Sequence, residues 1–289
     1  EGDQVWVSAP AAAGEHVRRA GEDLAAGQEV FGAGTVLGPG HLGVLCSVGR
    51  ERVAAVVAPV VGVLSTGDEL IEGGGALLPG QIRDSNRRTL MALLRRDGFQ
   101  AVDLGIARDD GAEIERRLLD GVARCDAVVT SGGVSMGDFD WVKLVLDRIG
   151  KMDWMQVAIR PAKPFAFGLV GATPVFGLPG NPVSSMVSYE VLARPGLRRM
   201  AGRQEGDWYR VPVPAIVDDG GWRGAKDGRT TFTRVEVGLQ ADGRYHVRSA
   251  GGQGSHQLHA MALADGLAIV PPDAAVLIGD DVDLLLLGP

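Results

Sequence analysis

The sequence predicts an α/β fold, a three-layer domain with a mostly parallel sheet, followed by a small β domain. Two observations predict it. Between residues 61 and 203, short buried strands alternate with amphipathic helices, a pattern typical of βαβ units. Between residues 204 and 289, short strands are separated by Gly and Asp turns, which indicates a small C-terminal β-barrel-like domain.

Residues 1–60 are rich in Gly and Ala and predict a remnant of N-terminal domains. We expect a partial β-rich segment here, with a strand-like piece at Val5–Val7 and a helix at His41–Val48. The first residue is Glu1 rather than Met, so we expect the chain to be N-terminally incomplete.

The α/β domain begins with a predicted strand at Val61–Ser65. Asn86 can cap the next helix, and Gly98 is placed to end it. Asp109 or Asp110 can cap the helix after that. The remaining elements are strands at 101–107 and 127–130, a helix at 141–149, strands near 154, 165 and 175, a helix from 182 and a last strand at 282–287.

Composition limits the class of protein. A hydrophobic fraction of 45% with 22% charged residues is that of a folded globular chain. The net charge of -7 argues against nucleic-acid binding. The longest apolar run of the chain falls short of the roughly 20 residues that are needed to cross a bilayer. Cys46 and Cys125 are predicted to be buried thiols. We expect a cytoplasmic protein that binds neither nucleic acid nor membrane.

Three strand-to-loop junctions fall at corresponding ends of the predicted sheet, at 65–69, 131–135 and 178–182. Open α/β sheets bind ligands at such strand ends. Gly180-Asn181-Pro182 suits a helix start whose amides cradle a phosphate, or simply a well-capped helix. Ser131-Gly132-Gly133 lets a ligand approach the backbone closely, or simply makes a tight turn.

Charged side chains gather around these loops. The carboxylates are Asp68, Glu69, Asp84, Asp109, Asp138 and Asp140. Two or three of them can hold Mg²⁺. For any single one, a helix cap or a solvated side chain is the favoured role, and only the set favours metal binding. Arg160 and Lys163 bring two cations to a proline-stiffened turn, where they can bind an oxyanion or stay exposed. Neither a dinucleotide fingerprint, a P-loop, a zinc motif nor a nucleophile elbow is present.

Six motifs occur in an order and spacing that resemble one family. They lie at residues 18–23 (RRAGED), 65–70 (STGDEL), 84–87 (DSNR), 131–135 (SGGVS), 163–165 (KPF) and 179–182 (PGNP). Together they resemble the molybdopterin molybdotransferases, the MoeA and gephyrin E-domain family. The resemblance covers nearly the whole chain and implies an α/β domain of the molybdopterin-binding type.

The resemblance also implies an activity. Molybdate would be inserted into adenylylated molybdopterin with Mg²⁺ present, and AMP would be released by a homodimer that can receive its substrate from a molybdopterin adenylyltransferase. Glu69, Asp109 and Asp140 would be catalytic and Mg²⁺-binding, with Asp23 contributing from the N-terminal segment. The implied substrate-binding residues are Asp84, Asn86, Ser131, Gly132, Gly133, Ser135, Arg160, Lys163, Pro179, Gly180, Asn181, Pro182, Ser184, Arg229 and Ser255.

The chain departs from the family pattern at two positions. Gln156 stands where a cation is usual, and Arg160 stands where Lys is usual, although Arg still binds an oxyanion. The nearest alternatives are a molybdopterin adenylyltransferase or a CinA-type nucleotide amidase, which would lack the β domain and the 18–23 motif. A gephyrin-like scaffold is a second alternative, but no linker or peptide-binding insertion resembles one.

Overall fold

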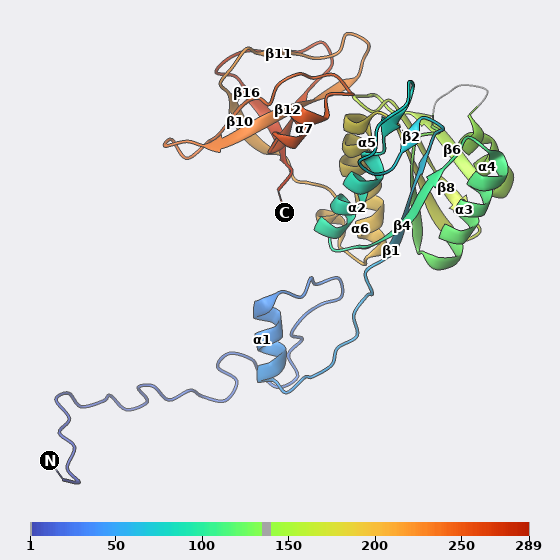
Figure 1. Cartoon of the computed structure of the whole chain (residues 1–289). Coiled ribbons are helices and arrows are strands. Elements are labelled where there is room, and N and C mark those ends of the chain that lie inside the picture. The colour runs from blue at the N-terminus through green and yellow to red at the C-terminus, as the bar shows by residue number, and fades with distance from the viewer. Residues whose placement is uncertain (1, 135–139, 289) are drawn as a thin grey trace. The chain divides into compact units, whose positions relative to one another are not determined.

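The computed structural model describes residues 2–134 and 140–288, and the chain divides into two compact units, Glu1–Glu51 and Arg52–Pro289. The first unit contains the helix α1 (Pro39–Ser47), close to the position that the sequence predicts, and no strand occurs in residues 2–51 (Figure 1). The predicted β-rich segment is therefore wrong for these residues. Val5–Val7 is exposed and has no partner strand, and an isolated strand can neither pair its backbone nor bury its side chains.

The second unit begins with an α/β domain. Its strands are β1 (Val60–Thr66), β2 (Leu70–Ile71), β3 (Ile82–Arg83), β4 (Gln100–Ala107), β5 (Ala127–Ser131), β6 (Lys151–Gln156), β7 (Ile159–Arg160), β8 (Pro164–Val170) and β9 (Thr173–Leu178). Its helices are α2 (Asn86–Arg96), α3 (Gly111–Arg124), α4 (Trp141–Ile149), α5 (Pro182–Ser188), the π-helical turn η1 (Tyr189–Ala193) and α6 (Arg194–Met200).

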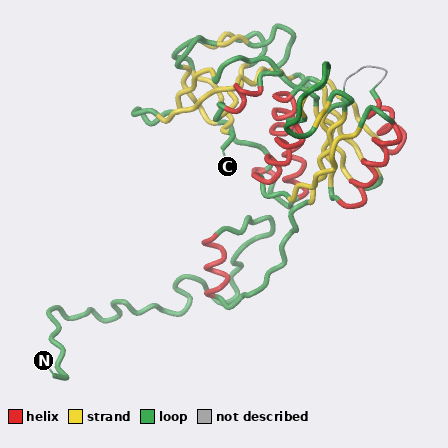
Figure 2. Tube along the Cα trace, viewed as in Figure 1, coloured by secondary structure: helices red, strands yellow, loops and turns green. Residues whose placement is uncertain are grey.

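The main sheet has the strand order β4-β1-β5-β9-β8-β6. The first four strands are parallel, and β8 runs antiparallel to both its neighbours. One apolar cluster packs α2, η1 and α6 on one face of the sheet, and a second packs α3 and α4 on the other face (Figure 2). This confirms the three-layer, mostly parallel domain that alternating strands and helices predict.

The β domain follows the α/β domain. Its elements are the 3-10 turn η2 (Glu205–Asp207), β10 (Val213–Val217), β11 (Trp222–Arg223), β12 (Thr230–Leu239), β13 (Tyr245–Ser249), α7 (Leu258–Ala262), β14 (Gly266–Val270), β15 (Ala275–Val276) and β16 (Asp281–Leu286). The order β13-β10-β16-β14-β12 closes into a barrel because β12 also pairs with β13. The predicted small barrel is confirmed.

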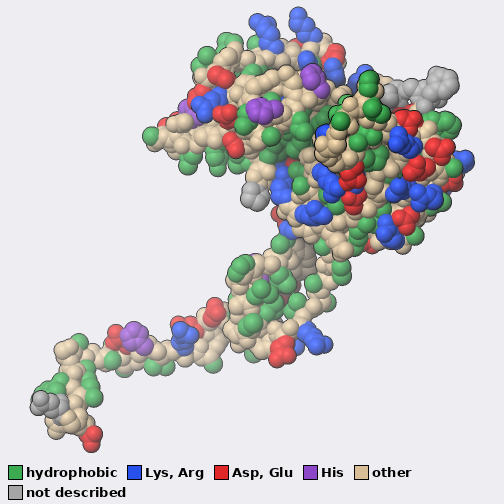
Figure 3. Space-filling view, viewed as in Figure 1, with side chains coloured by type: hydrophobic (Ala, Val, Ile, Leu, Met, Phe, Trp, Pro, Cys, Tyr) green, Lys and Arg blue, Asp and Glu red, His purple; other side chains and the backbone are tan. Residues whose placement is uncertain are grey.

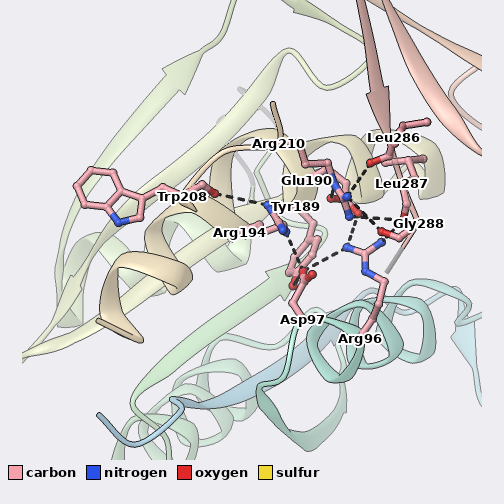
Figure 4. Close-up of polar contacts among 10 residues, drawn as sticks. All are labelled: Arg96, Asp97, Tyr189, Glu190, Arg194, Trp208, Arg210, Leu286, Leu287 and Gly288. Atoms are coloured by element: carbon pink, nitrogen blue, oxygen red, sulfur yellow. Dashed lines mark hydrogen bonds and ion pairs between the residues drawn. The ribbon is translucent and has the colours of Figure 1, made fainter. Parts of the chain in front are cut away.

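Two features join the barrel to the α/β domain. The short strand β7 pairs with β12, in the register Ile159 to Thr230 and Arg160 to Thr231. A charged network then ties the end of β16 to α2 and η1, because Arg210 donates to the carbonyl oxygen of Leu286 at 2.6 Å and to Glu190 at 2.8 Å (Figure 4). The network fixes the barrel against the helices that cover the sheet.

Local predictions fail at two positions. Asn86 is the first residue of α2, and Ser85 is the cap, because the Asn86 side chain is used elsewhere. Cys46 is exposed whereas Cys125 is buried, because α1 buries none of its residues. None of the helices in the described ranges has both the length and the apolarity that crossing a bilayer requires.

Candidate functional site

A cavity of about 850 Å³ lies where β1, β5 and β9 end in the α/β domain. Its lining includes most of the loop residues that the sequence singles out. They are Glu69, Asp84, Asn86, Asp109, Ser131, Gly132, Gly133, Asp140, Pro179, Gly180, Asn181 and Pro182. The carboxyl ends of parallel strands meet at one edge of a sheet, so these loops converge although they are far apart in the sequence.

Glycines bring the loop after β5 close to its neighbours. Gly132 has φ +96°, and a Cβ there would lie 2.9 Å from the carbonyl oxygen of Thr66. Gly133 has φ +68°, and a Cβ there would overlap with Val142 in the first turn of α4. A side chain at either position would push the loops apart or strain the backbone. The cavity wall here is therefore bare backbone, which a phosphate or a flat ring can approach closely.

Asn86 holds two of these loops together. Its Nδ2 atom donates to Ser131 Oγ at 2.8 Å and to the Gly180 carbonyl oxygen at 2.7 Å. One side chain at the start of α2 thus fixes the ends of β5 and β9 relative to each other. This explains why Asn86 does not cap its own helix.

Asp84 forms part of the cavity wall, but its carboxylate is already engaged. The side chain is 2% exposed, and its oxygens accept from Ser65 Oγ at 3.0 Å and from Arg87 Nε at 2.8 Å. Burial lowers the pKa of Arg87, but Asp84, Asp103 and Glu72 together hold that pKa above its ordinary value. Asp84 therefore supports the wall through Arg87 rather than offering free oxygens to a ligand.

Glu69, Asp109 and Asp140 all line the cavity. Asp140 caps α4 by accepting from the amides of Val142 and Lys143, at 3.1 and 3.4 Å. In the described ranges, no three His, Cys, Asp or Glu side chains are grouped so as to hold a metal. Mg²⁺ commonly binds one or two carboxylates together with substrate phosphates, so these residues fit the ion only when a ligand supplies further oxygens.

Several other predicted residues lie outside the lining. Arg160 and Lys163 are exposed, Ser184 is buried in α5, and Arg229 is paired with Asp227 at 2.7 Å. The hydrogen bond from Arg229 is the main cause that lowers the pKa of Asp227. Ser255 lies next to the site, because its carbonyl oxygen accepts from Val183 N at 3.1 Å.

The remaining predicted residues are Asp23, Ser135 and Asp138. Asp23 belongs to the first unit. Ser135 and Asp138 lie outside the described residues.

The structure adds residues that the sequence does not single out. His256 lines the cavity from a glycine-rich loop of the barrel, together with Trp141 and Arg83 of the α/β domain. Arg234 of β12 is 0% exposed and holds that loop, since its Nη2 atom donates to the carbonyl oxygens of Gly252 and Gly254 at 2.6 and 3.2 Å. Burial lowers the pKa of Arg234. Only the glycines of 251–254 signal this loop in the sequence.

Comparisons with known proteins agree with this architecture. Residues 1–49 match the MoeA N-terminal region (domain I and II), residues 62–199 match a probable molybdopterin binding domain, and residues 224–287 match the MoeA C-terminal region (domain IV). A molybdopterin molybdenumtransferase 2 from Mycobacterium tuberculosis is 37% identical over 284 residues, which cover 94% of this chain and 67% of that protein. The chain belongs to the MoeA family of molybdopterin molybdenumtransferases.

Two further MoeA-family proteins show the same relationship. A molybdopterin molybdenumtransferase from Haemophilus influenzae is 39% identical over 242 residues, 84% of this chain and 59% of that protein. A molybdopterin biosynthesis MoeA protein from Pyrococcus horikosii superimposes with a TM-score of 0.70 at 29% identity, covering 88% of this chain and 61% of the other. This MoeA-family chain thus spans about three fifths to two thirds of these relatives. The matches at both ends support MoeA over the adenylyltransferase and CinA-type alternatives.

Proposed function

We propose that this chain acts in molybdenum cofactor biosynthesis as a molybdopterin molybdotransferase, which inserts molybdate into adenylylated molybdopterin and releases AMP. The observation that carries the proposal is the cavity, where bare glycine backbone and three carboxylates share one wall. The substrate class fits this wall, because its phosphates need close backbone approach and the carboxylates can hold a cation that neutralises its pyrophosphate.

We further propose that Mg²⁺ acts at this wall. Glu69, Asp109 and Asp140 would hold the ion together with the pyrophosphate oxygens of the substrate. The ion would neutralise the charge that develops when the bond to AMP breaks. Asn86 would keep the Gly180 loop and the Ser131 loop in register, so that the substrate is oriented toward the carboxylates.

We also propose that the protein works as a homodimer in the cytoplasm and receives its substrate from a molybdopterin adenylyltransferase. The first unit exposes apolar side chains such as Trp6, and Val57, shortly after this unit, is exposed as well. Exposed apolar side chains favour a surface that binds a partner. The free, exposed thiol of Cys46 favours a reducing compartment. Light scattering on the purified protein checks the dimer, because a monomer at micromolar concentration would contradict it.

The deciding experiment measures AMP release from adenylylated molybdopterin, with and without molybdate, in Mg²⁺ and in EDTA. The Haemophilus influenzae relative serves as the positive control. Molybdate-dependent release that EDTA abolishes supports the proposal in full. Release that persists in EDTA removes only the Mg²⁺ role. If the chain instead forms pyrophosphate from ATP and molybdopterin, it is an adenylyltransferase, and binding without any turnover points to a scaffold.

A further inference from the structure

Trp141 is unusual among the tryptophans of the second unit. It lines the cavity and stays 46% exposed, although burial of an indole is strongly favourable. Trp154 and Trp208 donate their Nε1 hydrogens to Asp147 at 2.7 Å and to the Arg203 carbonyl oxygen at 2.8 Å. Trp222 packs against the apolar core of the barrel. Like Trp222, Trp141 has no acceptor for its Nε1 atom in the described part of the chain. Neither packing nor hydrogen bonding therefore uses this side chain fully.

The indole is nevertheless held in place. Trp141 is the first residue of α4, whose start is fixed by the Asp140 cap. A Cβ at Gly111 would lie 3.2 and 3.3 Å from Trp141 Cε3 and Cζ3, so the ring edge rests against the first turn of α3. Glycine is a poor helix former, and this close contact gives it a reason to stand there. An aromatic side chain that is anchored at one edge and open elsewhere loses little entropy on binding a ligand.

The position of the indole indicates which part of a ligand it meets. Gly111 follows Asp109 by two residues, and Asp140 immediately precedes Trp141, so the segments that hold the ring also carry two carboxylates of the cavity lining. Without a bound cation, carboxylates repel a phosphate, whereas they accept hydrogen bonds from ring amino groups. A flat, uncharged heterocycle with N–H donors is the chemistry that fits both the indole face and its acidic flanks.

We propose that Trp141 is the stacking platform for the fused heterocycle of the ligand, an adenine or a pterin, and positions that ring beside Asp109 and Asp140. The identity of the heterocycle rests on the proposed function, whereas the stacking itself does not. The glycine loop lies next to this platform, because Gly133 packs against Val142 in the same helical turn. One ligand can therefore place its phosphate on the loop and its ring on the indole.

The test compares Trp141→Ala and Trp141→Phe with the matched control Trp154→Phe. Isothermal titration measures the affinity of each protein for AMP, for 6-hydroxymethylpterin and for ribose 5-phosphate, which has a phosphate but no ring system. We expect Trp141→Ala to weaken binding of AMP or of the pterin about 5- to 150-fold, the usual effect of losing one base–aromatic stack. Trp141→Phe should keep most of the affinity, and ribose 5-phosphate should bind equally to all variants.

If Trp141→Ala loses affinity for AMP alone, the platform binds adenine. If it loses affinity for the pterin alone, the platform binds the pterin. The proposal is overturned if neither ring compound binds the wild-type protein or if Trp141→Ala leaves both affinities unchanged. It is also overturned if Trp141→Ala lowers the affinity for ribose 5-phosphate by the same factor as the affinity for the ring compounds. Fluorescence gives a second readout, because ring binding should quench the wild type and Trp154→Phe but not Trp141→Phe. Failed AMP release with intact Trp141-dependent binding would remove only the proposed function, and normal release with unchanged ring affinity would remove only this inference.

Discussion

Two charged regions of the second unit are built in opposite ways. In the network that joins the barrel to the helices, the side chains of Asp97 and Glu190 are only 6% and 1% exposed (Figure 4). Glu190 accepts from Arg96 at 2.6 Å and from Arg210 at 2.8 Å. In the cavity, Glu69 and Asp109 are exposed, and within the described ranges their carboxylates accept no hydrogen bond.

The difference separates charges that hold the fold from charges that remain available to a ligand. Burial of an ion pair is tolerated only when each charge keeps its partners, so removing one partner is strongly destabilising. An exposed carboxylate contributes little to stability and keeps its oxygens for an ion or a substrate. Elsewhere on the visible face of the α/β domain, acidic and basic side chains are interspersed (Figure 3). Charge alone does not mark the site, whereas Glu69 and Asp109 combine unpartnered carboxylates with a place in the cavity lining.

The largest expected effect is on turnover. Asp109→Asn should lower kcat for AMP release about 10²- to 10⁴-fold, because the amide can neither act as a base nor neutralise Mg²⁺. The urea midpoint should stay within experimental error of the wild type, since the lost charge is exposed. Asp153→Asn, on the exposed edge strand β6, is the matched control. Undiminished AMP release by Asp109→Asn would show that this exposed carboxylate has no role in turnover.

Next comes the stability of the charged network. Glu190→Ala should reduce the free energy of unfolding by about 3–5 kcal/mol, because Arg96 and Arg210 would keep buried charges without their shared carboxylate. Glu236→Ala is the control, since its partner Arg248 is 68% exposed, and it should change stability by about 1 kcal/mol or less. Urea denaturation measures both. Equal losses of unfolding free energy in the two variants would show that burial does not make the Glu190 ion pairs more important for stability than the exposed Glu236 pair.

The same network should respond to acid. Burial raises the pKa of Asp97, but the Tyr189 hydroxyl and Arg96 outweigh it and hold that pKa below its ordinary value. A depressed folded-state pKa contributes stability above the unfolded pKa of about 3.9, and this contribution is lost as pH falls through the folded value. Unfolding free energies between pH 7 and pH 2 should fall less steeply for Asp97→Asn than for the wild type. An identical slope would show that Asp97 is not coupled to folding.

The smallest effect concerns the loop clamp. Asn86→Ala should reduce the free energy of unfolding by about 1–2 kcal/mol, because Ser131 and the Gly180 carbonyl lose a shared donor. Asn181→Ala is the control on the same cavity wall, since the Asn181 side chain makes no capping hydrogen bond. Thermal unfolding with AMP titration checks both. A loss for Asn181→Ala as large as that for Asn86→Ala would refute the clamp.

Much of the fold could be predicted because its signals are local. Hydrophobic periodicity places β1, β4 and β5 within a residue or two, and Asp110 caps α3 as its sequence suggests. The N-terminal segment shows the limit of such signals. Val5–Val7 has a strand-like composition, but only a second strand could have turned it into sheet.

The candidate site could be predicted only in outline. Three junctions at corresponding strand ends sufficed to bring together Glu69, Gly132 and Gly180, because parallel strands present their carboxyl ends at one edge. The sequence could not say that β7 would leave the main sheet and pair with the barrel, and therefore that Arg160 would lie outside the cavity. Strand pairing depends on a partner that is chosen only in the folded chain.

By itself, the sequence thus determined the order of elements, the glycine loops and the set of carboxylates at their ends. Only the tertiary structure decided what each polar group does. Asp84 and Asp109 are the same residue type at the same edge, yet Arg87 engages one while the other stays exposed. Asn86 serves partners 45 and 94 residues away instead of its own helix. The physical reason is that a polar side chain's role depends on which donors, acceptors and water surround it, and distant segments supply these only after folding.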